Sequence, residues 1–319
     1  MRIAIVSDIH GNRTAFEAVL ADLRQTSPDV IFHGGDLADG GASPPAIVDQ
    51  IRDLGWPGVV GNTDEMLFRP ESLQEFAAQS AGFRPLLSTV EEMAAFSREA
   101  LGEERLAWLR GLPPVQVHGG MALVHASPAS CWRAPAPEAS DAELESVYAP
   151  LGQPIAVYGH IHRSYARTLP SLTVVNSGSA GLPYDGDRRA AYLLLDGSQP
   201  QIRRVEYDVD RELKALAECA SLTPHGSRKC SQAAAPKCRK ICWKSEFSER
   251  ERWPTAAAQV CHTMATAGRP TYLLLDESRP QIRRVEYDVV RELKALAECG
   301  LPHAAWVAKM LASGRPQMP

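Results

Sequence analysis

The chain has 319 residues, of which 45% are hydrophobic and 23% charged, with a formal net charge of −4. These values are typical of a soluble globular protein of one or two domains. The first apolar run has only four residues and no signal-peptide core, and no run of about 18 apolar residues could span a bilayer. Seven scattered cysteines favour reduced thiols over a disulfide framework. We therefore expect a cytoplasmic protein that is not associated with membranes.

Short apolar runs alternate with longer helical patterns along the chain. A helix is predicted over residues 13–25, where apolar residues recur at helical spacing and Thr14 and Glu17 are spaced as a capping box. Residues of about 65–112 interleave charged and large apolar side chains, which predicts a helical insertion that could form a lid. Six runs are strand-like by length, by β-branched content and by their closing turn residues: 2–8, 30–36, 57–62, 121–127, 154–160 and 172–178.

Polar side chains follow five of these strands at the point where each strand ends. Open α/β sheets bind their ligands at the carboxyl ends of strands, and two residues that are two apart point to the same side. The set holds two carboxylates, one amide and four imidazoles, an inventory that suits a pair of divalent transition metals sharing one carboxylate. Its members are Asp8, His10, Asp36, Asn62, His125, His160 and His162.

Two other histidines fall outside this pattern. His33 has no partner at ligand spacing within its own segment, so we expect a structural role. His118 precedes Gly119 and Gly120, which predicts a place beside a hairpin turn.

The segments SDIHGN, GGDLADGG, VVGNTD, LVHASP and YGHIH resemble the five motif blocks of the calcineurin-like metallophosphoesterases. The chain is most similar to the bacterial phosphodiesterase-like branch, over roughly residues 1–220 and a short tail after Cys299. This resemblance implies an α/β fold in which two β-sheets pack face to face and are flanked by helices. Carried over by position, it implies one metal held by Asp8, His10 and His162, a second held by Asn62, His125 and His160, and Asp36 as the bridge.

The resemblance implies a binuclear metal-dependent phosphoesterase, in particular a phosphodiesterase. Two metals polarise the phosphoryl oxygens, and the hydroxide that bridges them attacks phosphorus in line. The expected substrate is a phosphate-ester small molecule or a nucleotide. Manganese, iron, nickel and zinc all suit the donor set, because cellular supply as well as ligand type decides metal identity.

Four residues near the motif blocks have candidate roles of their own. Thr63 stands where many family members carry a histidine that protonates the leaving group, so we expect good leaving groups such as aryl phosphodiesters to be favoured. Asp64 is a candidate catalytic residue, together with Asn62, because its carboxylate could orient a neighbouring ligand. Arg13 and Arg163 could add positive charge over the phosphate, although surface arginines commonly only solvate a face.

Two other classes of function stay open beside the hydrolase. A relative of this fold serves as a protein-binding scaffold with a degraded metal site, and such a scaffold or phospho-ligand sensor should have lost ligands. None of the seven is missing. A nuclease would want a basic groove, whereas the matched portion is net acidic, so nucleic acid is an improbable partner.

A string of 28 residues at 192–219 returns in almost the same form at 272–299. Each copy predicts two strands and a helix, and only one copy can occupy the sheet. We expect the first copy to pair beside the strand at 172–178, with the second extending an edge or substituting for it. Removing one 80-residue period would leave 239 residues, closed by a helix within 300–311.

The segment 221–271 between the copies has no useful periodicity. Its stretch 228–252 holds eight basic and three acidic residues, which leaves open a tether for nucleic acid or an acidic partner. A zinc knot of Cys230, Cys238, Cys242 and the Cys261–His262 pair has gaps unlike zinc-site spacings. We favour an irregular or disordered insertion. The expected organisation is thus a metallophosphoesterase domain at 1–220, this insertion at 221–271, and the second copy plus a closing helix at 272–319.

Overall fold

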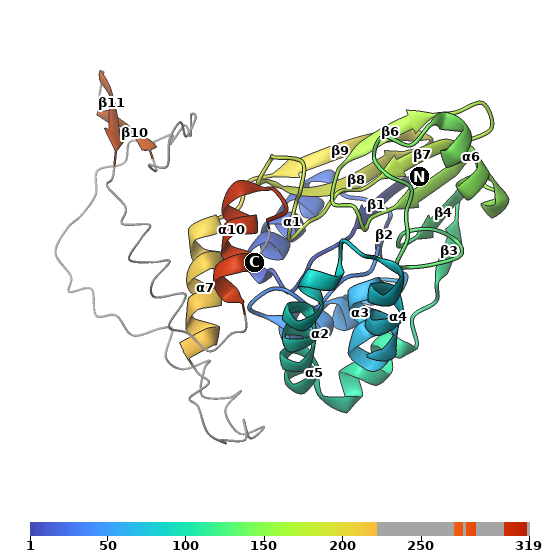
Figure 1. Ribbon diagram of the computed structural model, residues 1–319. Coiled ribbons are helices and arrows are strands. Elements are labelled where there is room, and N and C mark those ends of the chain that lie inside the picture. Colours follow the sequence, from blue (N-terminus) through green and yellow to red (C-terminus); the bar gives the residue numbers. More distant parts are fainter. Residues whose placement is uncertain (222–270, 277–278, 285–302, 318–319) are drawn as a thin grey trace. The chain divides into compact units, whose positions relative to one another are not determined.

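The computed structural model describes residues 1–221, 271–276, 279–284 and 303–317 (Figure 1). Contacts divide the chain into two units. The first comprises Met1–Leu222 and Leu296–Pro319, and the second comprises Thr223–Ala295. Among the described residues, no helix is both long and apolar enough to cross a membrane.

The first unit contains two mixed β-sheets. One sheet has the order β2 (Val30–His33), β1 (Arg2–Val6), β8 (Ala190–Asp196) and β9 (Gln199–Val205), in which β1 runs parallel to β2 and antiparallel to β8. The other has the order β3 (Val115–His118), β4 (Met121–Val124), β5 (Ile155–Tyr158), β7 (Thr173–Asn176) and β6 (Tyr165–Thr168). Its three central strands are parallel and its two edge strands antiparallel.

The two sheets pack face to face, which confirms the predicted sandwich. Side chains from the inner faces of both sheets form one apolar cluster, and removing them from water is the main force that holds the layers together. This cluster includes Ile3, Ile5, Phe32, Leu123, Val157, Val175, Leu193 and Leu195.

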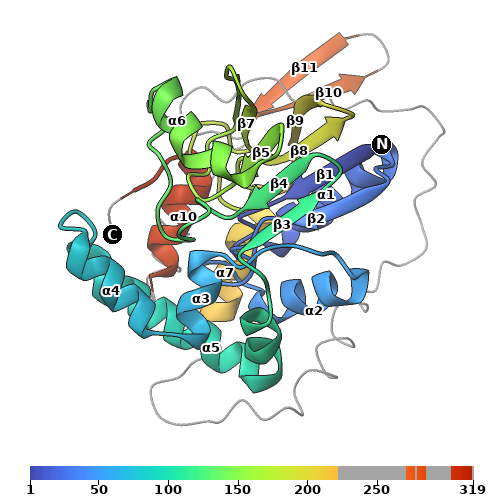
Figure 2. The same cartoon turned by 90° about the vertical axis from the view of Figure 1, so that its right-hand side faces the viewer.

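Helices cover the outer face of each sheet. The helices α1 (Arg13–Thr26) and α2 (Pro44–Leu54) pack their apolar sides with the outward residues of the first sheet. The helix α6 (Asp141–Tyr148) does the same on the second sheet. Near the chain's end, α10 (Ala304–Ser313) lies beside α7 (Val209–Ser221), as Figures 1 and 2 show.

Helices also occupy the region between β2 and β3. After α2 come α3 (Asn62–Phe68), α4 (Glu71–Gln79), a short 3-10 turn (Arg84–Leu86) and α5 (Leu87–Arg110), which is kinked at Gly102. They lie together at one side of the sandwich (Figure 2). Because α3 begins at Asn62, a predicted metal ligand forms the first residue of this helical insertion.

Three sequence-based expectations are wrong in detail. The N-cap of α1 is Asn12, whose side chain accepts a hydrogen bond from the Ala15 N–H, so Thr14 lies inside the helix and forms no capping box. Residues 57–62 are not a strand, because they make only an isolated bridge between His33 and Gly58. The first copy of the repeat does enter a sheet, but β8 pairs with β1 and not with β7, whose other edge is already taken by β6.

The turn at His118 follows its prediction. His118 ends β3, and Gly119 and Gly120, with φ of 55° and 82°, connect it to β4. Two consecutive positive φ angles are the geometry of a tight hairpin turn, which glycine adopts without steric cost.

The second unit contains part of the second copy. The strands β10 (Thr271–Asp276) and β11 (Arg279–Arg284) pair antiparallel, with Tyr272 opposite Arg283 and Asp276 opposite Arg279. The equivalent residues of the first copy pair in the same register. The proposed tether and zinc knot within 221–271 lie outside the described residues, which resume at 271.

Candidate metal centre

Six of the seven predicted ligands follow strands whose carboxyl ends point to one edge of the sandwich, and the seventh, Asn62, is the first residue of α3. Asp8 and His10 follow β1, Asp36 follows β2, His125 directly follows β4, and the pair at 160 and 162 follows β5. Five of them have left-handed backbones that only glycine adopts freely, with φ between 50° and 64°: Asp8, His10, Asp36, His160 and His162. Such strain concentrates at functional sites.

One group of four side chains converges tightly. Asp8, His10, Asp36 and His162 each offer one ligand atom, all are buried, and these atoms lie within 4.8 Å of one another. His162 Nε2 is 3.1 Å from Asp8 Oδ1, and His10 Nε2 is 3.6 Å from Asp36 Oδ2. Carboxylate and imidazole together are a common donor set for divalent transition metals.

A second group lies on the other side of Asp36. Asn62 Oδ1 is 2.9 Å from both His125 Nε2 and His160 Nδ1. His125 Nε2 is also 3.4 Å from Asp36 Oδ1. The two oxygens of Asp36 therefore face different groups, Oδ2 the first and Oδ1 the second.

The tautomers of the imidazoles show that this cluster fits a cation. His10 Nδ1 lies 2.7 Å from the Asp39 carbonyl oxygen, and His162 Nδ1 lies 2.5 Å from that of Leu182. A carbonyl oxygen only accepts, so each Nδ1 carries the hydrogen, and each neutral ring leaves a lone pair on Nε2. These two Nε2 atoms are only 3.2 Å apart. Two facing lone pairs cannot bond to each other, whereas a cation would satisfy both.

Burial and neighbouring charges shift the pKa values of the carboxylates. Burial opposes ionisation of Asp36, but the facing imidazoles, His125 foremost, hold its pKa well below the ordinary value. Asp8 behaves similarly, because burial is outweighed by His162, which lowers its pKa. Both bear their negative charge at neutral pH, as metal ligands must.

The imidazoles shift in opposite directions. Burial, with the charge of His125, lowers the pKa of His160 to about 4, and burial with His162 lowers that of His10. Burial alone would also lower the pKa of His125, but the Asp36 carboxylate raises it to about 10. One proton is therefore held at His125 beside Asp36, in the place where a cation would compete for the same lone pair.

Backbone contacts fix Asp36 in this position. Asp64 accepts hydrogen bonds from three backbone N–H groups, those of Asp36 at 2.7 Å, Leu37 at 2.9 Å and Gly61 at 3.1 Å. Burial and the charge of Asp36 raise the pKa of Asp64 to about 7. A Cβ at Gly61 would lie 2.1 Å from Asp36 Oδ1, so only glycine permits this close approach.

Of the other predicted residues, Thr63 contacts the cluster, whereas Arg13 and Arg163 form ion pairs elsewhere. Thr63 donates its backbone N–H to Asp36 Oδ1 at 2.9 Å, and its buried hydroxyl has no hydrogen-bond partner among the described residues. Arg13 and Arg163 are about half exposed and form ion pairs with Glu17 and Glu138 at 2.8 and 3.8 Å. No measured contact joins either arginine to the seven ligands within the described part of the chain.

The side chains of two residues that the sequence analysis did not single out contact predicted ligands. Ser7 donates its hydroxyl to Asp8 Oδ2 at 2.5 Å, and it stands within the first motif block, which was its only signal. The Tyr184 ring stacks on the His162 ring with centroids 4.3 Å apart. It comes from a turn-rich loop that no motif identifies.

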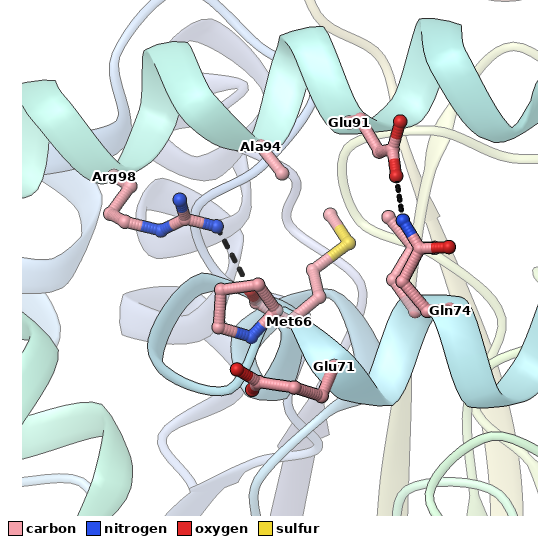
Figure 3. Close-up of a pocket in the computed structure, with 8 residues that line it drawn as sticks. Met66, Glu71, Gln74, Glu91, Ala94 and Arg98 are labelled. Carbon is pink, nitrogen blue, oxygen red and sulfur yellow. Dashed lines mark hydrogen bonds between the residues drawn. The ribbon is translucent and has the colours of Figure 1, made fainter.

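A separate cavity of about 300 Å³ lies within the helical insertion (Figure 3). Met66, Glu71 and Gln74 from α3 and α4 face Glu91 and Arg98 of α5 across it. None of its lining residues is a predicted metal ligand, so this cavity and the metal-ligand cluster are distinct.

Comparisons with known proteins identify the family and its fold. A family model, the calcineurin-like phosphoesterase superfamily domain, matches residues 1–199. An uncharacterised protein of Methanocaldococcus jannaschii is 28% identical over 239 residues, which cover 68% of this chain and 92% of that protein. The crystal structure of a metallophosphoesterase from Sphaerobacter thermophilus is 25% identical, with a TM-score of 0.55 and coverage of 68% and 93%. A hypothetical protein from Pyrococcus horikoshii, at 18% identity, a TM-score of 0.59 and coverage of 67% and 92%, shares the fold. The chain therefore belongs to the calcineurin-like phosphoesterase superfamily.

Proposed function

We propose that the protein hydrolyses phosphate esters, preferentially phosphodiesters, with two divalent transition-metal cations held at this cluster. The observation that carries the proposal is the placement of Asp36, whose two carboxylate oxygens face separate groups of donors. A carboxylate shared by two cations would hold them close together, as two-metal catalysis requires.

With Asp36 counted in both, each donor group has four donor side chains. Asp8, His10 and His162 would hold one and Asn62, His125 and His160 the other, with Asp36 shared. When bound, the cations would polarise the phosphoryl oxygens and lower the pKa of water, so that it attacks near neutral pH.

The chain's own residues contribute position and proton control. Asp64 fixes the turn that carries Asp36, through its three backbone N–H contacts. Thr63 lies beside Asp36 and offers a hydroxyl that does not titrate near neutral pH, so protonation of a poor leaving group has no strong donor at this position. This favours esters whose leaving group departs as a stable anion. Arg13 and Arg163 are proposed to add positive charge near the phosphate.

The alternatives have less support. A non-catalytic scaffold or phospho-ligand sensor would not need seven intact ligands, five of them in strained backbone conformations. A nuclease would need a basic groove, whereas the family-matched region is net acidic. Substrates are therefore expected among small phosphate esters, including nucleotides, and the cation among manganese, iron, nickel and zinc.

The test compares the full chain with the variant Asp36→Ala. Elemental analysis measures the bound metal, and hydrolysis of a bis-aryl phosphodiester measures activity. We expect close to two equivalents of metal in the wild type and a loss of metal and activity in Asp36→Ala. Asp53→Ala, at an exposed carboxylate of α2, is the matched control and should change neither.

The outcomes separate the functions. Metal without hydrolysis of any phosphate ester would favour the sensor. An active protein that holds a single equivalent would contradict the two-cation arrangement. If Asp36→Ala kept its metal, the proposal that the two cations share this carboxylate would be wrong.

A further inference from the structure

We propose that the C-terminal helix α10 positions the metal ligand His162 through Tyr184. The inference rests on the proposed function, because it treats His162 as a ligand. It adds a positioning residue and a supporting helix that lie outside the motif blocks.

Three contacts determine where the His162 ring can lie. Its Nδ1–H donates to the Leu182 carbonyl, and its own carbonyl accepts from the Tyr184 N–H at 3.0 Å. The Tyr184 ring lies almost parallel to the imidazole, at an interplanar angle of 16°. The hydrogen bond sets which nitrogen faces the cluster, and the stacked ring limits rotation of the imidazole plane. Both partners come from one loop, residues 182–184.

The same loop is held from the other side by α10. The Tyr184 hydroxyl donates to Met310 Sδ at 3.6 Å, and the Gly186 N–H donates to the Gly314 carbonyl at 2.9 Å. Gly314 ends α10 in a left-handed conformation, with φ of 61°. A Cβ there would lie 3.3 Å from the backbone of residues 186–188, so the end of α10 fits closely against this segment.

The apolar side of α10 anchors it within the first unit. Val307, Ala308, Met310 and Leu311 are all buried, whereas Lys309 between them is exposed. The helix packs beside α7 (Figure 1). Residues more than 120 positions downstream of Tyr184 thus determine how firmly its ring covers His162.

The arrangement predicts a site-specific effect. Tyr184 stacks on His162, and none of its measured contacts involves His125, His160 or Asn62. Loss of the stacked ring should therefore weaken the cation site of Asp8, His10 and His162 and spare the other. Outer contacts of this kind typically change metal affinity by about 10- to 100-fold.

The experiment titrates Mn²⁺ into the chelator-treated full chain and resolves the two dissociation constants by calorimetry. Tyr184→Leu removes the stacked ring, whereas Tyr184→Phe keeps the ring and removes only the hydroxyl. We expect the affinity of one site to fall about tenfold or more in Tyr184→Leu, with the second unchanged. Tyr184→Phe should stay within about threefold of the wild type at both sites.

The helix is tested by Met310→Ala, with Lys309→Ala as its matched control on the exposed side. Met310→Ala should weaken the same site as Tyr184→Leu, by a smaller factor, and Lys309→Ala should weaken neither. Circular dichroism at each titration temperature establishes that the variants are folded.

The results distinguish this inference from the proposed function. If the wild type binds two cations and Tyr184→Leu binds both equally well, the positioning role is wrong and the function stands. An equal loss at both sites would mean a general structural role and would also overturn it. If the wild type binds no cation, the proposed function fails and this inference fails with it.

Discussion

His33 is a buried base without a partner, and acid should destabilise the protein through it. The ring is fully buried at the end of β2, packed over Gly58, and neither nitrogen has a hydrogen-bond partner among the described residues. Burial lowers its pKa to about 3. A histidine in the unfolded chain has a pKa of about 6.5. Between these values the unfolded chain binds one more proton than the folded protein, so stability falls as the pH falls below about 6.5.

The magnitude follows from the two pKa values. At about pH 5 the unfolded histidine is almost fully protonated, while the folded one is neutral. The free energy of unfolding should therefore drop by about 2 kcal/mol between about pH 7 and pH 5 because of this one group. The drop is insensitive to the folded pKa, provided that this value stays below about 4.

The assay is urea unfolding of wild type and His33→Leu at both pH values. Subtracting the two pH differences removes the contributions of the candidate ligand histidines, which both proteins share. We expect the variant to lack about 2 kcal/mol of the pH dependence. At neutral pH it should be as stable as the wild type or more stable, because an apolar side chain replaces an unsatisfied polar one. His118→Leu, at a partly exposed ring, is the matched control for a histidine-to-leucine change outside the buried core.

A difference below about 0.5 kcal/mol between the two pH responses would refute this account. It would mean that the buried ring is stabilised in its charged form by a group that faces it. A large loss of stability in His33→Leu at neutral pH would lead to the same conclusion.

Bis-aryl phosphodiesters should be cleaved far faster than alkyl monoesters, because Thr63 offers no titrating proton donor; equal rates would contradict this. Deleting Tyr192–Thr271 should leave metal content and hydrolysis intact, because the second copy then supplies the strands and helix of the first. An unfolded product would show that the copies are not equivalent. Asp64→Asn should lower the free energy of unfolding by about 1 to 3 kcal/mol in urea, since one of three buried N–H groups loses its acceptor. No change would mean that Asp64 does not hold the Asp36 turn.

The convergence of the candidate ligand side chains at one edge could be predicted because local rules place most of them. Six of the seven follow a short apolar strand, and the ends of parallel strands meet at one edge of a sheet, whereas Asn62 begins α3. The residue types then indicate the chemistry. The left-handed backbones at these positions could not be foreseen, because non-glycine residues adopt them only where the surrounding structure compensates for the strain.

The errors come from contacts between distant segments. We expected β8 beside β7, but that edge of β7 is occupied by β6, a four-residue strand whose sequence signal is weak, and β8 pairs with β1. Residues 57–62 are apolar and short like a strand, yet find only one bridge partner. Tyr184 was missed because its contact with His162 is made by a loop outside the motif blocks, and its support by α10 is farther still in sequence.

The hairpins β8–β9 and β10–β11 have the same register, which indicates that local sequence determines how their strands pair. The hairpin β8–β9 is paired beside β1, and β10–β11 belongs to the other unit, yet Tyr192 lies opposite Arg203 and Tyr272 opposite the equivalent Arg283. The register of this hairpin is therefore determined by its own residues and not by the neighbouring strand β1. A hairpin of this kind needs few contacts between distant residues to form. It can therefore form early in folding and then pair with β1.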